Sequence, residues 1–147
     1  KKICKAIPLP FIENLVGPII VSPKNKIAKR IFSKLGHVIE IKDEKISYSF
    51  WSTSSAMAAY YEIYSSTKNW LVKKGLNERV ATDYVAELFL ALSKDAFAKK
   101  KIGFKKLVAE SQTPKGLNMQ VLKELKKVRF YDKFKQSLIN VHKRIKR

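Results

Sequence analysis

The sequence predicts a mostly α-helical chain in which a short strand–strand–helix–strand segment comes before a series of helices. Two patterns carry this prediction. Residues 1–42 contain short β-branched runs separated by turns, whereas from residue 43 onward apolar residues recur at helical spacing. The chain has 147 residues, of which 46% are hydrophobic, so it can form an ordinary folded core.

The first segment has the pattern of an incomplete sheet. β-Branched runs at residues 3–7, 18–23 and 37–41 predict three strands, and a short amphipathic helix ending at Gly36 lies between the last two. Three strands are few for a sheet that must be covered on both faces. We therefore expect residues 1–42 to be the closing part of a larger α/β sheet, with its first half preceding Lys1.

Residues 43–147 form the predicted helical domain, with helices at 44–74, 78–100, 104–111, 117–127 and 131–145. Gly75 ends the first helix, Asn77 is a favourable N-cap for the second, and Gly103 breaks that second helix. The helix at 78–100 has an unusually broad apolar stripe. This breadth suggests burial against a second subunit.

The charge is strongly basic. Lys and Arg total 31 against 12 acidic residues, which gives a net charge of +19. Only five of the basic residues are Arg, the residue that reads bases and binds phosphate in bidentate fashion, so nucleic acid is an unlikely partner. We favour a solvated basic surface. The alternative is a non-catalytic dimerising module that binds polyanions, for which the basic run at residues 143–147 argues.

Several classes of protein are not favoured. The chain has no apolar run of the roughly 18–20 residues that a membrane span needs, and no signal peptide, so we expect a cytoplasmic protein without a membrane partner. A single cysteine, Cys4, fits a reducing compartment. His37 and His142 have no Cys, Asp or Glu cluster at ligand spacing, so no metal site is predicted. Aromatic residues at helical spacing are expected in the core or an interface; they are Tyr60, Tyr61, Tyr64 and Trp70.

Five segments, taken in order, carry a family resemblance. They are Lys5-Ala6-Ile7-Pro8-Leu9-Pro10, Leu35 to Glu44, Ser54-Ser55-Ala56-Met57-Ala58-Ala59-Tyr60, Gly75-Leu76-Asn77-Glu78-Arg79 and Gln112-Thr113-Pro114-Lys115-Gly116-Leu117-Asn118. The first is similar to R-x-M-P-N, the second to a glycine, short strand and acidic pair, the third to S-G-S-G-P-A-Y, the fourth to G-L-P-R-E and the fifth to T-S-P-G-G-T-T. Together they resemble the C-terminal half of pyrroline-5-carboxylate reductases.

The resemblance implies a fold and an activity. Residues 1–42 would be the C-terminal portion of a Rossmann-like domain, and residues 43–147 a helical dimerisation and substrate domain resembling the 6-phosphogluconate-dehydrogenase-like C-terminal fold. The parent protein would be a homodimeric oxidoreductase that transfers hydride from NADP or NAD to a cyclic imine or related small acid, as in proline biosynthesis. This chain lacks a G-x-G-x-x-G turn, so no cofactor is expected on it alone.

The resemblance also implies site residues, although it assigns no catalytic one. Substrate binding falls to Ser54, Ser55, Thr113, Gly116 and Asn118, and Pro8 would lie beside the cofactor. Each has a plainer interpretation. Small residues after Ser54 also suit close helix packing, and the segment from Thr113 to Asn118 also suits an ordinary loop-to-helix junction.

The chain departs from the family pattern at several positions. Ser55 and Met57 replace the glycines of the third motif, and Ala58 replaces its proline. Leu117 and Asn118 replace the paired threonines of the last motif, and of these only Asn118 can donate a side-chain hydrogen bond. Leu9 stands where the first motif has asparagine. These changes leave the identity of the substrate open.

Overall fold

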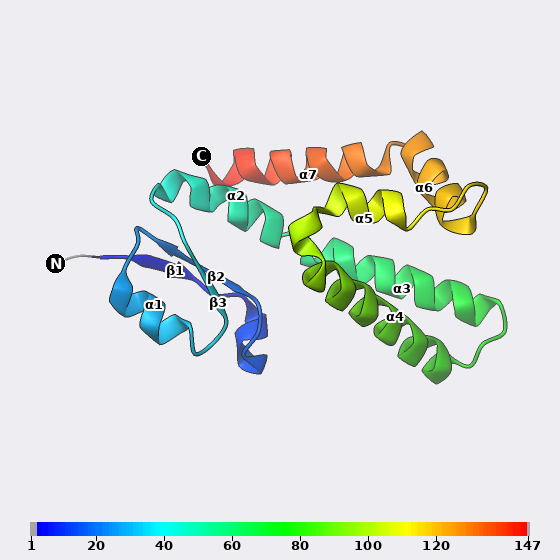
Figure 1. Cartoon of the computed structure of the whole chain (residues 1–147), viewed down its shortest axis with the longest axis horizontal. Coiled ribbons are helices and arrows are strands. Elements are labelled where there is room, and N and C mark those ends of the chain that lie inside the picture. The colour runs from blue at the N-terminus through cyan, green and yellow to red at the C-terminus, as the bar shows by residue number, and fades with distance from the viewer. Residues whose placement is uncertain (1–2, 147) are drawn as a thin grey trace. The chain divides into compact units, whose positions relative to one another are not determined.

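The computed structural model describes residues 3–146; Lys1, Lys2 and Arg147, which belong to the predicted first domain and the basic C-terminal run, lie outside the described part. The chain forms two compact units, one of residues 1–56 with 135–147 and one of residues 57–134 (Figure 1). This division by compactness does not test the predicted domains 1–42 and 43–147, which stay a prediction.

The first unit contains a three-stranded sheet in the order β1-β2-β3. β1 (Lys5–Ile7) runs antiparallel to β2 (Pro18–Ser22), and β2 runs parallel to β3 (His37–Glu40). Helix α1 (Lys26–Phe32) forms the crossover between the two parallel strands, as the predicted strand–strand–helix–strand order requires. A short 3-10 helix, η1 (Pro10–Asn14), joins β1 to β2 and was not predicted.

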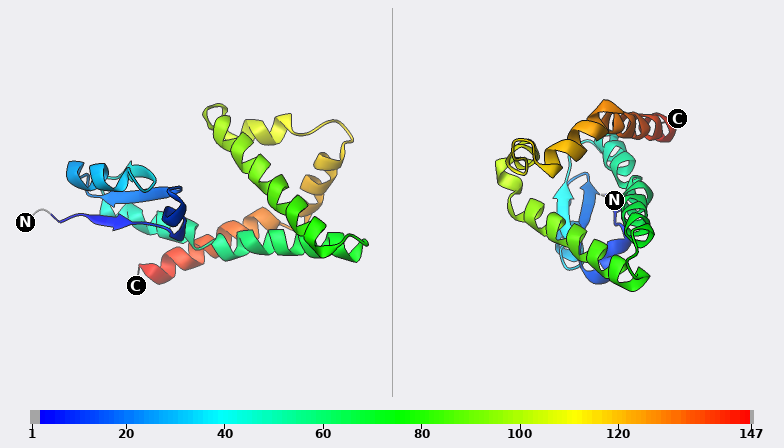
Figure 2. Two further views of the ribbon diagram at one scale, coloured as in Figure 1. Left: turned by 90° about the horizontal axis from the view of Figure 1, so that it is seen from below. Right: turned by 90° about the vertical axis from the view of Figure 1, so that its right-hand side faces the viewer.

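The core of this unit centres on β2. Ile19 and Val21 are completely buried and pack with Ala28 of α1. Successive strand residues point to opposite faces, so Ile20, which is also buried, faces the other side of the sheet. Helix α2 (Glu44–Ser54) lies on that side, so that α1 and α2 cover opposite faces (Figure 2).

One predicted helix is two helices. The periodicity of residues 44–74 predicts a continuous helix, but α2 ends at Ser54 and α3 (Met57–Lys73) begins three residues later. The physical reason lies at Ser55, whose hydroxyl donates to the carbonyl of Ser52. A continuous helix would need that carbonyl for the N–H of Ala56, which bonds to the carbonyl of Thr53 instead. Such local bonds compete with continued helix, which hydrophobic periodicity does not reveal.

The second unit is built on the hairpin of α3 and α4 (Glu78–Ala98). Gly75 takes a φ of +98° after α3, and the side chain of Asn77 accepts from the N–H groups of Arg79 and Val80, which confirms its role as N-cap. Ala81 and Val85 are buried on α4.

The remaining elements are η2 (Lys100–Ile102), α5 (Phe104–Glu110), α6 (Leu117–Lys127) and α7 (Phe130–Ile145), the last of which continues into the first unit. Among residues 3–146, no helix combines the length and apolar character needed to cross a bilayer.

Aromatic side chains join the two helices of this hairpin. Tyr64 stacks on Phe89 with ring centroids 4.3 Å apart, and the hydroxyl of Tyr60 lies 3.1 Å from that of Tyr64 and 3.3 Å from that of Ser93. Burial, followed by the hydrogen bond with Tyr60, raises the pKa of Tyr64 to about 12. Tyr60 and Tyr64 therefore serve the predicted packing role, while Tyr61 and Trp70 are more than half exposed in the single chain.

A tight turn precedes α6. The carbonyl of Thr113 accepts from the N–H of Gly116 at 2.9 Å, and Pro114 occupies the second position of the turn. Lys115, in the third position, has a φ of +60°. The left-handed region favours glycine, the residue that T-S-P-G-G-T-T has at this position.

Replacement of Lys115 by Gly should stabilise the protein by about 0.5–1 kcal/mol, because it relieves the cost of a side chain in the left-handed region. The free energy of unfolding in urea, compared at equal protein concentration, measures the effect. The matched control is Lys94→Gly within α4, which should instead destabilise by about 1 kcal/mol. A destabilised Lys115→Gly variant would contradict the strain in this turn.

A second prediction concerns Tyr64. Because its neutral phenol is favoured in the fold, its ionisation should appear at about pH 12 in the difference between the phenolate absorbance titrations of wild type and Tyr64→Phe. The raised pKa also means that the contribution of Tyr64 to stability is lost as the pH rises above the unfolded value of about 10. A difference titration centred near pH 10 would show that the hydroxyl is not held in this environment.

Candidate functional site

The loop between α5 and α6 brings together three of the predicted substrate-binding residues, Thr113, Gly116 and Asn118. Helix α6 begins at Leu117 without a side-chain cap. The N–H groups of Leu117, Asn118 and Met119 have no acceptor among residues 3–146, and the first bond to the preceding turn is from Gln120 to the carbonyl of Gly116. Free N–H groups with the positive end of the helix dipole favour an anion here.

Thr113 adds a hydroxyl to this helix start. The side chain is exposed, and within the described part of the chain its Oγ1 makes no hydrogen bond. A Cβ atom placed on Gly116 would lie 2.1 Å from Oγ1 of Thr113 and 3.0 Å from its carbonyl oxygen. The turn therefore requires glycine at this position, since any side chain would displace the threonine.

Asn118 has a bond that the sequence does not reveal. Its Nδ2 donates to the carbonyl of Ser111 at 2.9 Å and so ties the first turn of α6 to the end of α5. On the other side of the loop, Nε2 of Gln112 donates to the carbonyl of Val108 at 2.6 Å. The sequence predicts that the amide of Asn118 donates to substrate. In the structure this amide also closes the loop.

Ser54 and Ser55 lie at the break between α2 and α3, in the first unit. Both hydroxyl protons are used in the bonds to the carbonyls of Phe50 and Ser52, at 2.9 and 2.7 Å. In this arrangement each hydroxyl can accept a hydrogen bond from a ligand but has no proton left to donate. Thr113, Gly116 and Asn118 belong to the second unit.

Pro8 directly follows β1 and is exposed. The glycines near the sheet serve close packing: a Cβ atom on Gly36 would lie 2.6 Å from the carbonyl oxygen of Gly17. Neither belongs to a G-x-G-x-x-G turn between a strand and a helix.

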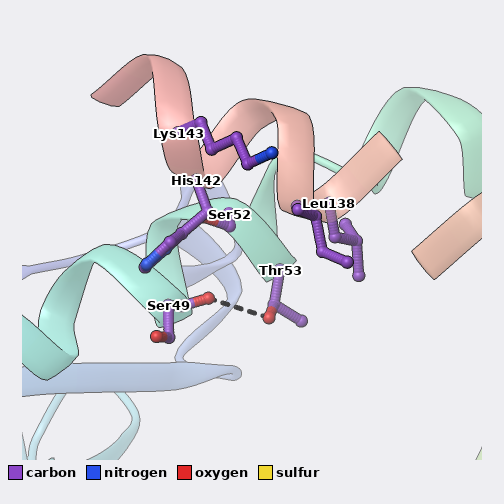
Figure 3. A pocket seen from close by; sticks show the side chains of 7 residues that line it. Ser49, Ser52, Thr53, Leu138, His142 and Lys143 are labelled. Atoms are coloured by element: carbon purple, nitrogen blue, oxygen red, sulfur yellow. Dashed lines mark hydrogen bonds between the residues drawn. The ribbon is translucent and has the colours of Figure 1, made fainter. Parts of the chain in front are cut away.

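A hollow of about 330 Å³ lies in the first unit between α2 and α7 (Figure 3). Its lining residues are Ser49, Ser52, Thr53, Leu138, Ile139, His142 and Lys143. Within it, Oγ of Ser52 lies 3.2 Å from Nδ1 of His142. This site was not predicted, because these two residues are 90 positions apart and no motif links them. Within residues 3–146, no group of three or more His, Cys, Asp or Glu side chains could hold a metal ion.

Comparison with solved structures relates the chain to reductases. It matches a pyrroline-5-carboxylate reductase of Coxiella burnetii with a TM-score of 0.83 and 19% identity over 97% of this chain and 56% of that one. A Plasmodium falciparum pyrroline carboxylate reductase with NADP bound gives 0.81 and 22%, over 96% and 58%. The 1-pyrroline-5-carboxylate reductase of Streptococcus pyogenes gives 0.82 and 15%, over 96% and 57%.

These three matches establish the fold. They confirm the predicted class, a small sheet segment followed by helices as in the C-terminal region of these reductases. The chain spans less than three fifths of each of these structures. A search among curated proteins gave no match.

The family comparison covers the helical part. Residues 43–147 match the model of the family described as "Pyrroline-5-carboxylate reductase dimerisation". This match spans more than half of the chain, and it confirms the family resemblance of the helical part; the first segment, Lys5 to Pro10, and most of the second lie outside it. The chain belongs to the pyrroline-5-carboxylate reductase dimerisation family.

Proposed function

We propose that this chain is the C-terminal part of an NAD(P)-dependent oxidoreductase that transfers hydride to a cyclic imine or a related small acid. In this proposal the chain supplies the dimer interface and part of the substrate pocket. The cofactor would be held mainly by residues that this chain does not contain, with Pro8 beside it. Family membership and the NADP-bound Plasmodium falciparum relative support this proposal.

The observation that carries the substrate role is the start of α6. Three free N–H groups and the unpaired hydroxyl of Thr113 lie in the segment that resembles T-S-P-G-G-T-T. We assign them to the carboxylate of the substrate, which would accept from the backbone of residues 117–119 and from Thr113. Leu117, 81% exposed beside them, would place an apolar surface where the related motif has a hydroxyl.

The dimer interface is assigned to the exposed stripe of α4. Val80, Tyr84 and Leu92 are each 56% exposed, and Leu88 is 36% exposed. These residues are four positions apart and so share one face of the helix. An apolar face of this extent on a soluble protein marks an interaction site. Since the family is a dimerisation family, we propose a second copy of the chain as the partner that covers it.

The substrate role predicts the effect of Thr113→Val in the full-length protein. With pyrroline-5-carboxylate as substrate and NADPH oxidation as the readout, loss of one hydrogen bond to a carboxylate should raise KM by about tenfold. The free N–H groups would remain, so kcat should change little.

The matched control is Thr67→Val, since Oγ1 of Thr67 donates within α3 to the carbonyl of Ile63. That substitution should leave KM within about twofold. If the two substitutions change KM equally, Thr113 does not bind the substrate. A wild-type protein that oxidises neither NADPH nor NADH with this imine would refute the proposed reaction.

The interface role predicts that Tyr84→Glu combined with Leu88→Glu weakens the homodimer. Two carboxylates from each copy would be buried in an apolar contact, and the dissociation constant should rise by at least about 100-fold. Sedimentation or light scattering at several protein concentrations measures the change.

Ile27→Glu is the control, because Ile27 is a 64% exposed apolar residue on α1 and lies outside the stripe. The control protein should dimerise as the wild type does. If the doubly substituted protein stays a dimer at the same concentrations, the α4 stripe is not the interface.

A further inference from the structure

In the hollow between α2 and α7, the donor and acceptor roles of Ser52 and His142 can be assigned. Oγ of Ser52 donates to the carbonyl of Tyr48 at 2.7 Å, so its single proton is used. Its 3.2 Å contact with Nδ1 of His142 must then have the imidazole as donor. In the neutral ring this leaves Nε2 as an acceptor without a proton.

The lining of the hollow has a positive charge on α7 and no negative charge. Lys143 provides an ammonium group for which the described residues contain no acidic partner, and no Asp or Glu lines the hollow. The side chain of Ser49 adds a hydroxyl, whereas Oγ1 of Thr53 donates to the carbonyl of Ser49 at 2.9 Å and can only accept from a ligand. Figure 3 shows His142 and Lys143 on α7 across from Ser49 and Thr53 on α2.

Leu138 and Ile139 give the hollow an apolar wall one turn before His142 on the same helix. A ligand that suits all these groups has an anionic end, a neighbouring N–H donor and a short apolar body. At about 330 Å³ the hollow lies at the small end of ligand pockets.

We propose that this hollow binds a small apolar α-amino acid in its zwitterionic form. The carboxylate accepts from Nζ of Lys143, and the ammonium group donates to Nε2 of His142. The apolar side chain packs against Leu138 and Ile139. This site is separate from the α5–α6 loop and does not depend on the proposed reaction.

Simpler ligands satisfy only part of this set. A carboxylic acid without an amino group has no donor for Nε2 of His142 and forgoes that hydrogen bond. An amine without a carboxylate brings a second cation beside Lys143, and like charges repel. The combination of cation and acceptor therefore selects the zwitterion over either half.

Isothermal titration of the full-length protein with three probes tests the proposal. L-2-Aminobutyrate should bind with a dissociation constant on the order of 1 mM, as expected for so small a ligand. Butyrate and propylamine, which carry only one of the two charges, should bind at least about tenfold more weakly. Butyrate binding as tight as that of aminobutyrate, or no binding of any probe up to about 30 mM, overturns the proposal.

Substitutions test whether aminobutyrate binds in the hollow. Lys143→Met and His142→Phe should each weaken aminobutyrate binding by at least about tenfold, whereas Lys146→Met and His37→Phe should leave it within about twofold. Lys143 is exposed, so its substitution leaves folding intact. Thr113→Val separates this site from the proposed substrate site. Binding that is lost in Thr113→Val and kept in Lys143→Met overturns the proposal, while the reverse pattern supports it whether or not the protein reduces an imine.

Discussion

Few apolar side chains are fully buried in the described part of the single chain, and this shortage is the constraint on which the rest of the structure depends. Among the described residues only six apolar side chains are buried, and four of them, Ile19, Ile20, Val21 and Ala28, belong to the sheet and its crossover helix. The helices from α3 onward contribute just Ala81 and Val85. Helices are stabilised mainly by packing of their apolar faces, which agrees with the proposal that a second copy covers the stripe on α4. The stripe on α4 is one of these faces.

Much of the fold could be predicted from the sequence because it rests on local chemistry. β-Branched runs identified the three strands, Gly75 ended a helix and Asn77 began one, whereas α1 ends at Phe32, before the predicted stop at Gly36. The break after Ser54 could not be predicted, since it depends on the hydroxyl of Ser55, which takes the carbonyl of Ser52, rather than on apolar spacing. The 3-10 turn at residues 10–14 was missed for a similar reason, because it has no apolar period of its own.

The candidate site was only partly accessible from the sequence. The loop at residues 112–118 could be found because its residues are neighbours in the chain and resemble a motif. That Asn118 donates to Ser111 could not be predicted, since several carbonyls lie within reach of such a side chain. The hollow in which Ser52 contacts His142 could not be predicted from the sequence, because only the fold brings α2 and α7 together. A basic surface was predicted, but its distribution among ion pairs such as Lys99 with Asp95 depended on the structure.

The bond from Asn118 to Ser111 has a consequence for how the loop can evolve. It closes a ring of eight residues around the turn, and the entropy lost in ordering that ring is therefore paid during folding. In the proposed substrate site, an anion that reaches the start of α6 would meet a preorganised backbone and need not order it. Recognition of the charged end of the ligand would then be separate from recognition of its body. Exposed neighbours such as Leu117 are free to vary with the shape of the ligand, while Gly116 and the closing amide stay fixed.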